Sequence, residues 1–132
     1  MIFENAYEIL KKIKQKEVSA QEVLESFLKQ VEAVNPSINA VVALDAERAL
    51  EKAKEADKKI ASKSKLGSLH GLPMTVKDAF EVEGIVSTGG NPAWRDNIPK
   101  RNAEAVQRLV DAGAIIFGTV SYTHLRAHET EA

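Results

Sequence analysis

The chain has 132 residues, of which 44% are hydrophobic and 28% charged, and its 18 Lys and Arg nearly balance its 19 Asp and Glu. This composition is typical of one soluble globular domain, and the near-neutral charge argues against a nucleic-acid-binding protein. The absence of cysteine excludes disulfides and thiolate metal sites. No apolar run approaches the ~20 residues that a membrane span needs, and no signal peptide is evident, so we expect a cytoplasmic protein.

Two helices are predicted in the first 36 residues. An apolar stripe indicates the first helix, and a break follows near Val18. The stripe consists of Tyr7, Leu10 and Ile13. Ser19 and Glu22 have the spacing of a capping box, in which each side chain accepts a hydrogen bond from the other residue's backbone N–H. This box starts the second helix, which we expect to end before Asn35 and Pro36. Its buried face comprises Val23, Leu24, Phe27, Leu28 and Val31.

A strand and a third helix are predicted next. The run from Ile38 to Leu44 is short, apolar and rich in β-branched residues, which is typical of a strand. Asp45 can cap the following helix, which we expect to reach Ser62. The inward face of this helix carries mostly small residues that allow close packing, namely Ala46, Ala49, Leu50, Ala53, Ala56 and Ile60. The polar residues 63–67 form a connector within one domain.

The second half of the chain predicts an α/β layer. Residues 74–76 and 114–117 have the composition of buried strands, and a helix is expected between them over residues 103–112. Asn102 is a candidate N-cap and Gly113 a candidate C′ residue. A helix that leads through glycine into an apolar strand indicates helices packed on a sheet.

One lysine stands where an apolar strand meets a glycine-rich loop. Residues 71–78 read Gly-Leu-Pro-Met-Thr-Val-Lys-Asp, so Lys77 ends the expected strand. Residues 86–101 hold several turn formers and predict a long loop, a kind that is uncommon without a function. A lysine at a strand end is usually a solvated surface charge. Such an amine can act as a base when apolar neighbours disfavour its charged form.

The motifs around this lysine resemble those of the amidase signature family. The matching pieces are Leu69-His70-Gly71-Leu72-Pro73, Val76-Lys77-Asp78, Gly84 with Ser87-Thr88-Gly89, Pro99, Asn102-Ala103-Glu104-Ala105-Val106 and Leu109-Val110-Asp111-Ala112-Gly113-Ala114. With the helical lead-in, the resemblance covers residues 1–118. It implies an α/β fold in which N-terminal helices lead into part of the family's mixed-sheet core, with the rest of that core missing.

The resemblance implies an amide hydrolase that uses a Ser-cisSer-Lys triad, with Lys77 as the lysine. Both serines would lie in a Gly/Ser-rich segment beyond this sequence, so these residues alone are expected to be inactive and marginally stable. The reaction converts a small-molecule amide to a carboxylate plus ammonia or an amine, without metal or cofactor. Neither nucleic acid nor a membrane is an expected partner, whereas a homodimer is compatible with this interpretation.

Two other functions stay open. One is the A subunit of the glutamyl-tRNA(Gln)/aspartyl-tRNA(Asn) amidotransferase, in which the same site releases ammonia from glutamine for partner subunits. Residues 78–82 and 90–92 look more like those of a free-standing amidase. The other is a non-enzymatic helical binding module, which leaves the pattern of residues 71–78 unexplained.

Four further residues have plainer interpretations than catalysis. His70 is expected to pack or cap locally. Ser87 and Thr88 are expected to hydrogen-bond the loop backbone, because no nucleophile elbow surrounds them. Trp94, the one tryptophan, either lines a substrate entrance or covers the core.

The last residues resemble a translated sequencing adapter. Residues 120–130 match the translation of a common transposase adapter in order, and the departure from the family pattern begins at the same place. We therefore expect residues 1–119 to be the N-terminal part of an amidase signature domain and residues 120–132 to be a non-native tail. Taken at face value, this tail could hold a metal ion through a histidine pair at i, i+4 beside a carboxylate. These residues are His124, His128 and Glu129.

Overall fold

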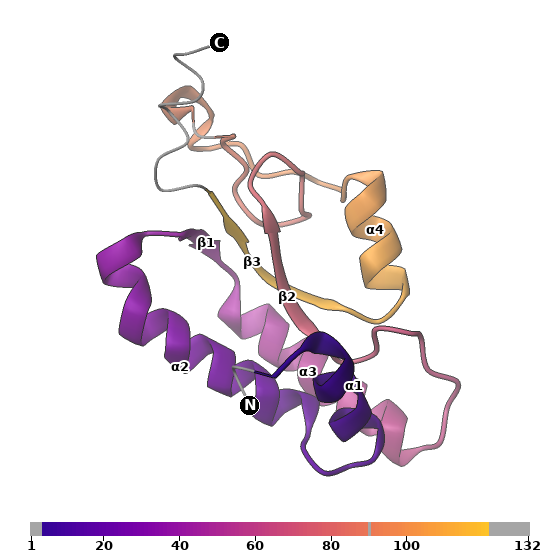
Figure 1. The fold of residues 1–132 in the computed structure, drawn as a ribbon. Helices are drawn as coiled ribbons and strands as arrows, with labels where there is room; N and C mark the ends of the chain where they lie inside the picture. Colours follow the sequence, from indigo (N-terminus) through magenta and orange to yellow (C-terminus); the bar gives the residue numbers. More distant parts are fainter. Residues whose placement is uncertain (1–3, 90, 122–132) are drawn as a thin grey trace.

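The computed structural model describes residues 4–89 and 91–121, and its helices and strands follow the predicted order (Figure 1). The elements are α1 (Ala6–Lys14), α2 (Ala20–Ile38), β1 (Val41–Leu44), α3 (Ala46–Ala61), β2 (Pro73–Lys77), the short 3-10 helix η1 (Pro92–Trp94), α4 (Glu104–Asp111) and β3 (Ile115–Val120). Within the described part of the chain, no helix is both long and apolar enough to span a membrane.

The three strands form one mixed sheet in the order β1-β3-β2. The central strand β3 pairs antiparallel with β1 and parallel with β2. The parallel register places Pro73 opposite Ile115 and Lys77 opposite Val120. Parallel neighbours need a crossover connection, which the long loop and α4 provide between β2 and β3. The predicted α/β fold with helices on a mixed sheet is confirmed.

Strand β3 contributes to hydrophobic cores on both faces of the sheet. Ile115 and Phe117 belong to a core with α2 and α3, whereas Ile116 belongs to a core with α4. Successive strand side chains point to opposite faces, so this alternation is expected. Figure 1 shows α4 on one side of the strands and the α2–α3 pair on the other. The small-residue face of α3 is buried as predicted, and its most buried members are Ala49, Ala53 and Ala56.

The start of α2 is hydrogen-bonded to two carboxylates. The predicted capping box is present, since Glu22 N donates to Ser19 Oγ (3.0 Å) and Ser19 N donates to Glu22 Oε2 (2.8 Å). Asp57 of α3 adds further acceptors, because Ala20 N donates to Asp57 Oδ1 (2.7 Å) and Gln21 N to Asp57 Oδ2 (3.2 Å). These acidic groups satisfy N–H groups that lack an intrahelical partner and face the positive end of the helix dipole. The two helices are thereby tied together at this end.

The end of α2 differs from the sequence-based expectation. The helix does not stop before Asn35 and Pro36 but runs through the proline to Ile38. Asn39 then ends the helix in the left-handed conformation (φ 49°), and its N–H donates to Asn35 O (2.6 Å). The Asn35 side chain also bonds the backbone N and O of Val41 (2.9 Å each). These bonds hold the helix end and the strand start together, so the strand begins at Val41 and not at Ile38.

Two predictions about helix surfaces and ends are also wrong. Tyr7 is 74% exposed, and Ile9 is buried in the core instead, because an i, i+4 pair of isoleucines sets the packed face of α1. Ala103, not Asn102, is the N-cap of α4. The Asn102 side chain accepts a hydrogen bond from Glu83 N (2.8 Å) and is therefore engaged with the preceding loop.

Candidate active site

Lys77 is the last residue of β2, and Ser121 directly follows β3. Since the two strands are parallel, both residues lie at the same edge of the sheet. Lys77 Nζ donates a hydrogen bond to Ser121 Oγ over 3.2 Å. The carboxyl ends of parallel strands are where open α/β sheets hold their ligands. The bond to Ser121 shows that the amine can reach a hydroxyl at this edge, and general-base activation of a nucleophile would require an uncharged amine that accepts the proton of such a hydroxyl.

Asp78 is buried, with 2% of its surface exposed, and ties the long loop to the end of β2. Its backbone N donates to Val120 O (2.8 Å). Its carboxylate accepts from Thr88 N (3.3 Å) and Thr88 Oγ1 (2.8 Å), and its backbone O accepts from Ser87 Oγ (3.1 Å). Asn97 closes the loop on itself, because its Nδ2 donates to Ser87 O (2.9 Å) and its O accepts from Ser87 N (2.8 Å). The loop is thereby anchored one residue away from the lysine.

The other candidate residues have structural roles. The Ser87 hydroxyl bonds backbone, as predicted, whereas the Thr88 hydroxyl bonds the Asp78 carboxylate instead. His70 packs locally, as predicted, with Nε2 2.9 Å from a backbone oxygen of α3. Trp94 is 55% exposed, so the interpretation that it covers the core is wrong. Its place at a substrate entrance stays a prediction.

Sequence reasoning assigned no role to Asp78 or Ser121. A signal existed for Asp78, because a carboxylate that follows an apolar strand is costly to bury unless hydroxyls or N–H groups bond it. No local signal existed for Ser121, since its contact with Lys77 spans 44 residues. The candidate metal ligands of the tail lie outside the described residues. Among residues 4–89 and 91–121, no group of three or more His, Asp or Glu could hold a metal ion.

Comparison with known proteins decides the family. A family model described as Amidase matches residues 22–127, which is most of the chain and includes the start of the tail. The chain belongs to the amidase signature family. This amidase-family chain is 39% identical over 114 residues to an acylamidase from Rhodococcus erythropolis, a match that covers 86% of the chain and 24% of the relative. It is 36% identical over 118 residues to the A subunit of the glutamyl-tRNA(Gln) amidotransferase from Acidothermus cellulolyticus, a match that covers 89% of the chain and 23% of that relative.

Solved structures of the family agree with the fold. A bacterial aryl acylamidase of the amidase signature family superposes with a TM-score of 0.84 at 28% identity, covering 90% of this chain and 25% of that one. The chain therefore spans about a quarter of the length of the relatives it matches. The predicted family and its partial α/β core are confirmed.

Proposed function

We propose that this chain is the N-terminal part of an amide hydrolase in which Lys77 is the lysine of a Ser-cisSer-Lys triad. The observation that carries the proposal is the position of Lys77, at the carboxyl end of the parallel strand β2 and within the residues 22–127 that match the amidase family model. The similarity to an acylamidase supports amides as the substrate class. Both catalytic serines would come from the part of the enzyme that these residues do not contain.

The proposed reaction is amide hydrolysis through an acyl-enzyme. An uncharged lysine amine takes a proton through the cis serine, and the nucleophilic serine attacks the amide carbonyl. Backbone N–H groups stabilise the tetrahedral oxyanion. Ammonia or an amine leaves, and water then releases the carboxylate. This sequence of steps needs no metal or cofactor, and the enzyme would work on small-molecule amides in the cytoplasm.

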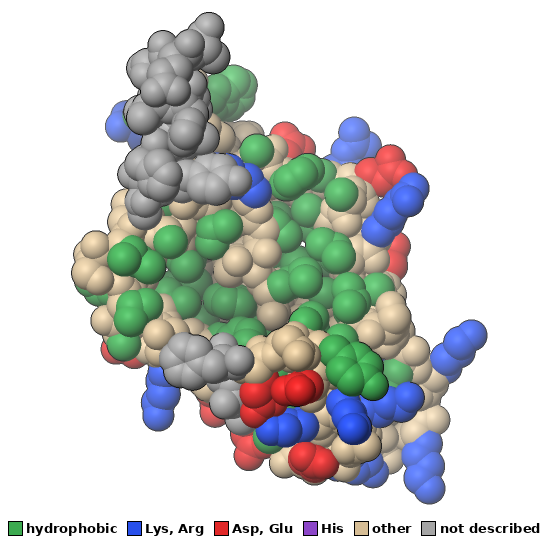
Figure 2. Space-filling view, in the orientation of Figure 1, with side chains coloured by type: hydrophobic (Ala, Val, Ile, Leu, Met, Phe, Trp, Pro, Cys, Tyr) green, Lys and Arg blue, Asp and Glu red, His purple; other side chains and the backbone are tan. Residues whose placement is uncertain are grey.

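Exposed apolar residues support a longer protein. The edge strand β1 exposes Val42 (43%) and Leu44 (49%), and Phe80 after β2 is 46% exposed. Figure 2 shows hydrophobic side chains gathered over the middle of the face seen in Figure 1. Open sheet edges and apolar patches are usually buried by another part of the protein or by a partner. In our proposal, the remaining three quarters of the enzyme cover them.

The second candidate function is that of the amidotransferase A subunit, which the similarity to the Acidothermus protein favours. In this alternative, ammonia released from glutamine passes to a partner protein.

The test uses the full-length enzyme made from the source gene. It is assayed for ammonia release from simple aliphatic and aromatic amides and, separately, from glutamine together with the partner proteins. Turnover of simple amides without partners supports the amidase, and glutamine turnover that requires partners supports the amidotransferase. Absence of both activities contradicts both proposals.

We also propose that residues 120–132 are not native. The in-order match to an adapter translation supports this origin. The proposal matters for the site, because Ser121 lies in this tail and its contact with Lys77 would then not be a feature of the native enzyme. Amplifying the locus from source DNA across the codon for Gly118 tests this. A product that encodes residues 120–130 as they stand would refute it.

A further inference from the structure

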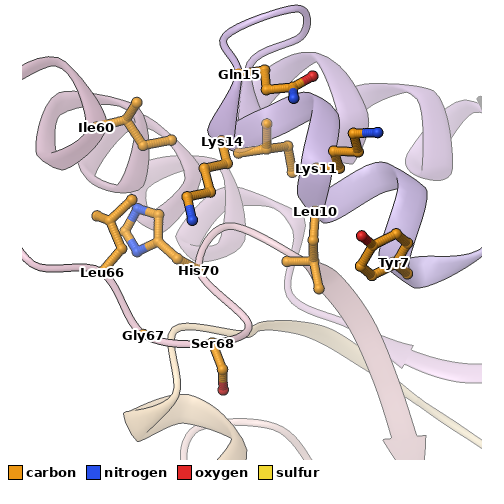
Figure 3. A pocket seen from close by; sticks show the side chains of 11 residues that line it. Tyr7, Leu10, Lys11, Lys14, Gln15, Ile60, Leu66, Gly67, Ser68 and His70 are labelled. Atoms are coloured by element: carbon orange, nitrogen blue, oxygen red, sulfur yellow. The ribbon is translucent and has the colours of Figure 1, made fainter.

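A cavity of about 660 Å³ lies between α1, the end of α3 and residues 66–70 (Figure 3). Small-molecule sites typically measure about 300 to 1,000 Å³ and combine apolar walls with a few polar groups. This cavity has both kinds of wall. Leu10, Ile60 and Leu66 line it with apolar surface, and Lys14, Ser68 and His70 line it with polar groups. Lys77 is not among its lining residues, so it is separate from the candidate active site.

The polar side of the cavity carries positive charge. Figure 3 shows the Lys14 side chain reaching from α1 toward His70, with Ser68 on the opposite wall. Lys11, also a lining residue, lies one turn earlier on the same helix. In the described part of the chain, Lys12 of this helix pairs with Glu4, but neither Lys11 nor Lys14 is in an ion pair. Within the described residues, the Lys14 ammonium group is therefore not engaged by a carboxylate of the chain.

His70 is anchored in this wall through one ring nitrogen. Its Nε2 lies 2.9 Å from Ala56 O, and a carbonyl oxygen only accepts hydrogen bonds, so Nε2 carries the hydrogen. This bond anchors the ring to α3 and occupies Nε2. An anion in the cavity would consequently be held by the Lys14 ammonium group, with the imidazole as a fixed side wall.

We propose that this cavity binds a small amphiphilic carboxylate, a molecule with one carboxylate and a short aryl or alkyl body. The carboxylate pairs with Lys14, and the apolar body packs between Leu10, Ile60 and Leu66. A bare inorganic anion would leave these apolar walls in water. A neutral apolar molecule would desolvate the ammonium group without compensating its charge. A cation would be repelled by Lys14.

The test compares a carboxylate with its uncharged isostere. The chain is titrated with 4-phenylbutyrate and with 4-phenylbutyramide, and binding is followed by amide chemical-shift changes. We expect the carboxylate to shift residues 66–70 and the C-terminal turn of α1, with an affinity about three- to fivefold above that of the amide, because a partly exposed ion pair contributes up to about 1 kcal/mol. Equal affinities, or carboxylate shifts confined to other residues, would overturn the proposal.

Three variants locate the contact. Lys14→Met keeps the apolar stem and should weaken carboxylate binding about three- to fivefold while leaving amide binding unchanged. Lys52→Met makes the same change on the exposed face of α3, away from the cavity, and should change neither affinity. Leu66→Asp places a negative charge on the wall and should abolish carboxylate binding without loss of the folded amide spectrum, since Leu66 is half-buried. Carboxylate binding that survives both Lys14→Met and Leu66→Asp would refute the site.

Discussion

The buried carboxylate of Asp78 should control how firmly the long loop is held beside Lys77. Asp78→Ala removes the acceptor of two hydrogen bonds from Thr88, at 3.3 Å to its N and 2.8 Å to its Oγ1. Hydrogen bonds to a charged group contribute about 1.5 to 3 kcal/mol each, but Thr88 is only partly buried and water can replace part of them. We therefore expect the free energy of loop opening to fall by about 2 to 3 kcal/mol.

Asp78→Asn should be milder, at about 1 kcal/mol. The amide keeps one acceptor, and the Thr88 hydroxyl can reverse its role and accept from the new NH2 group. Hydrogen exchange of the Ser87 amide is the assay, because its own bond to Asn97 O (2.8 Å) does not involve the altered side chain. A change of about 1.4 kcal/mol alters the equilibrium constant of loop opening about tenfold. Exchange of the Ser87 amide should therefore speed up roughly 30- to 150-fold in Asp78→Ala and about fivefold in Asp78→Asn. Amides of β3 serve as the internal control. Unchanged Ser87 exchange in Asp78→Ala, or equal effects of the two variants, would refute this reasoning.

Two further substitutions test the packing of the fold. Asp57→Asn removes the charge that faces the start of α2 and should lower the free energy of unfolding by about 0.5 to 1 kcal/mol in a urea titration. The exposed Glu55→Gln is the control and should have no measurable effect. Equal effects of the two substitutions would contradict a stabilising role for the hydrogen bonds from Ala20 N and Gln21 N to Asp57. Gly113→Ala forces a side chain into a position with φ +102° and 2.6 Å from His70 Cα, so it should cost roughly 2 to 4 kcal/mol. Gly89→Ala also has positive φ but open space around it, and a loss as large as that of Gly113→Ala would show that the clash is not the cause.

Local patterns in the sequence were enough to predict the main elements. The capping box at Ser19 forms because both partners lie within four residues, and the alanine face of α3 is buried because its period is helical. Gly113 has positive φ just after α4, as its position after the apolar pattern predicts. These features depend on near neighbours in the chain, which a sequence displays directly.

Features that depend on distant contacts could not be predicted from the sequence. α2 extends through Pro36, and at its end the Asn35 side chain is bonded to the following strand. Asn102 would have been a good cap, but a hydrogen bond from Glu83 N engages its side chain across the loop. At the site, the motif indicated Lys77, whereas the Asp78–Thr88 bonds arise only after the irregular path between these two residues is folded. Propensity and periodicity carry no information about such a path.

The central claim is that the Lys77 amine is the base of amide hydrolysis, and kinetics of Lys77 variants of the full-length enzyme test it most directly. Lys77→Met keeps the apolar stem without a base, and Lys77→Arg keeps a cation that does not give up its proton near neutral pH. We expect both to lower the acylation rate by about 10² to 10⁴-fold or more, with thermal melting close to that of the native enzyme. Near-normal amide turnover by a well-folded Lys77→Met enzyme would contradict the account and remove this lysine from the mechanism.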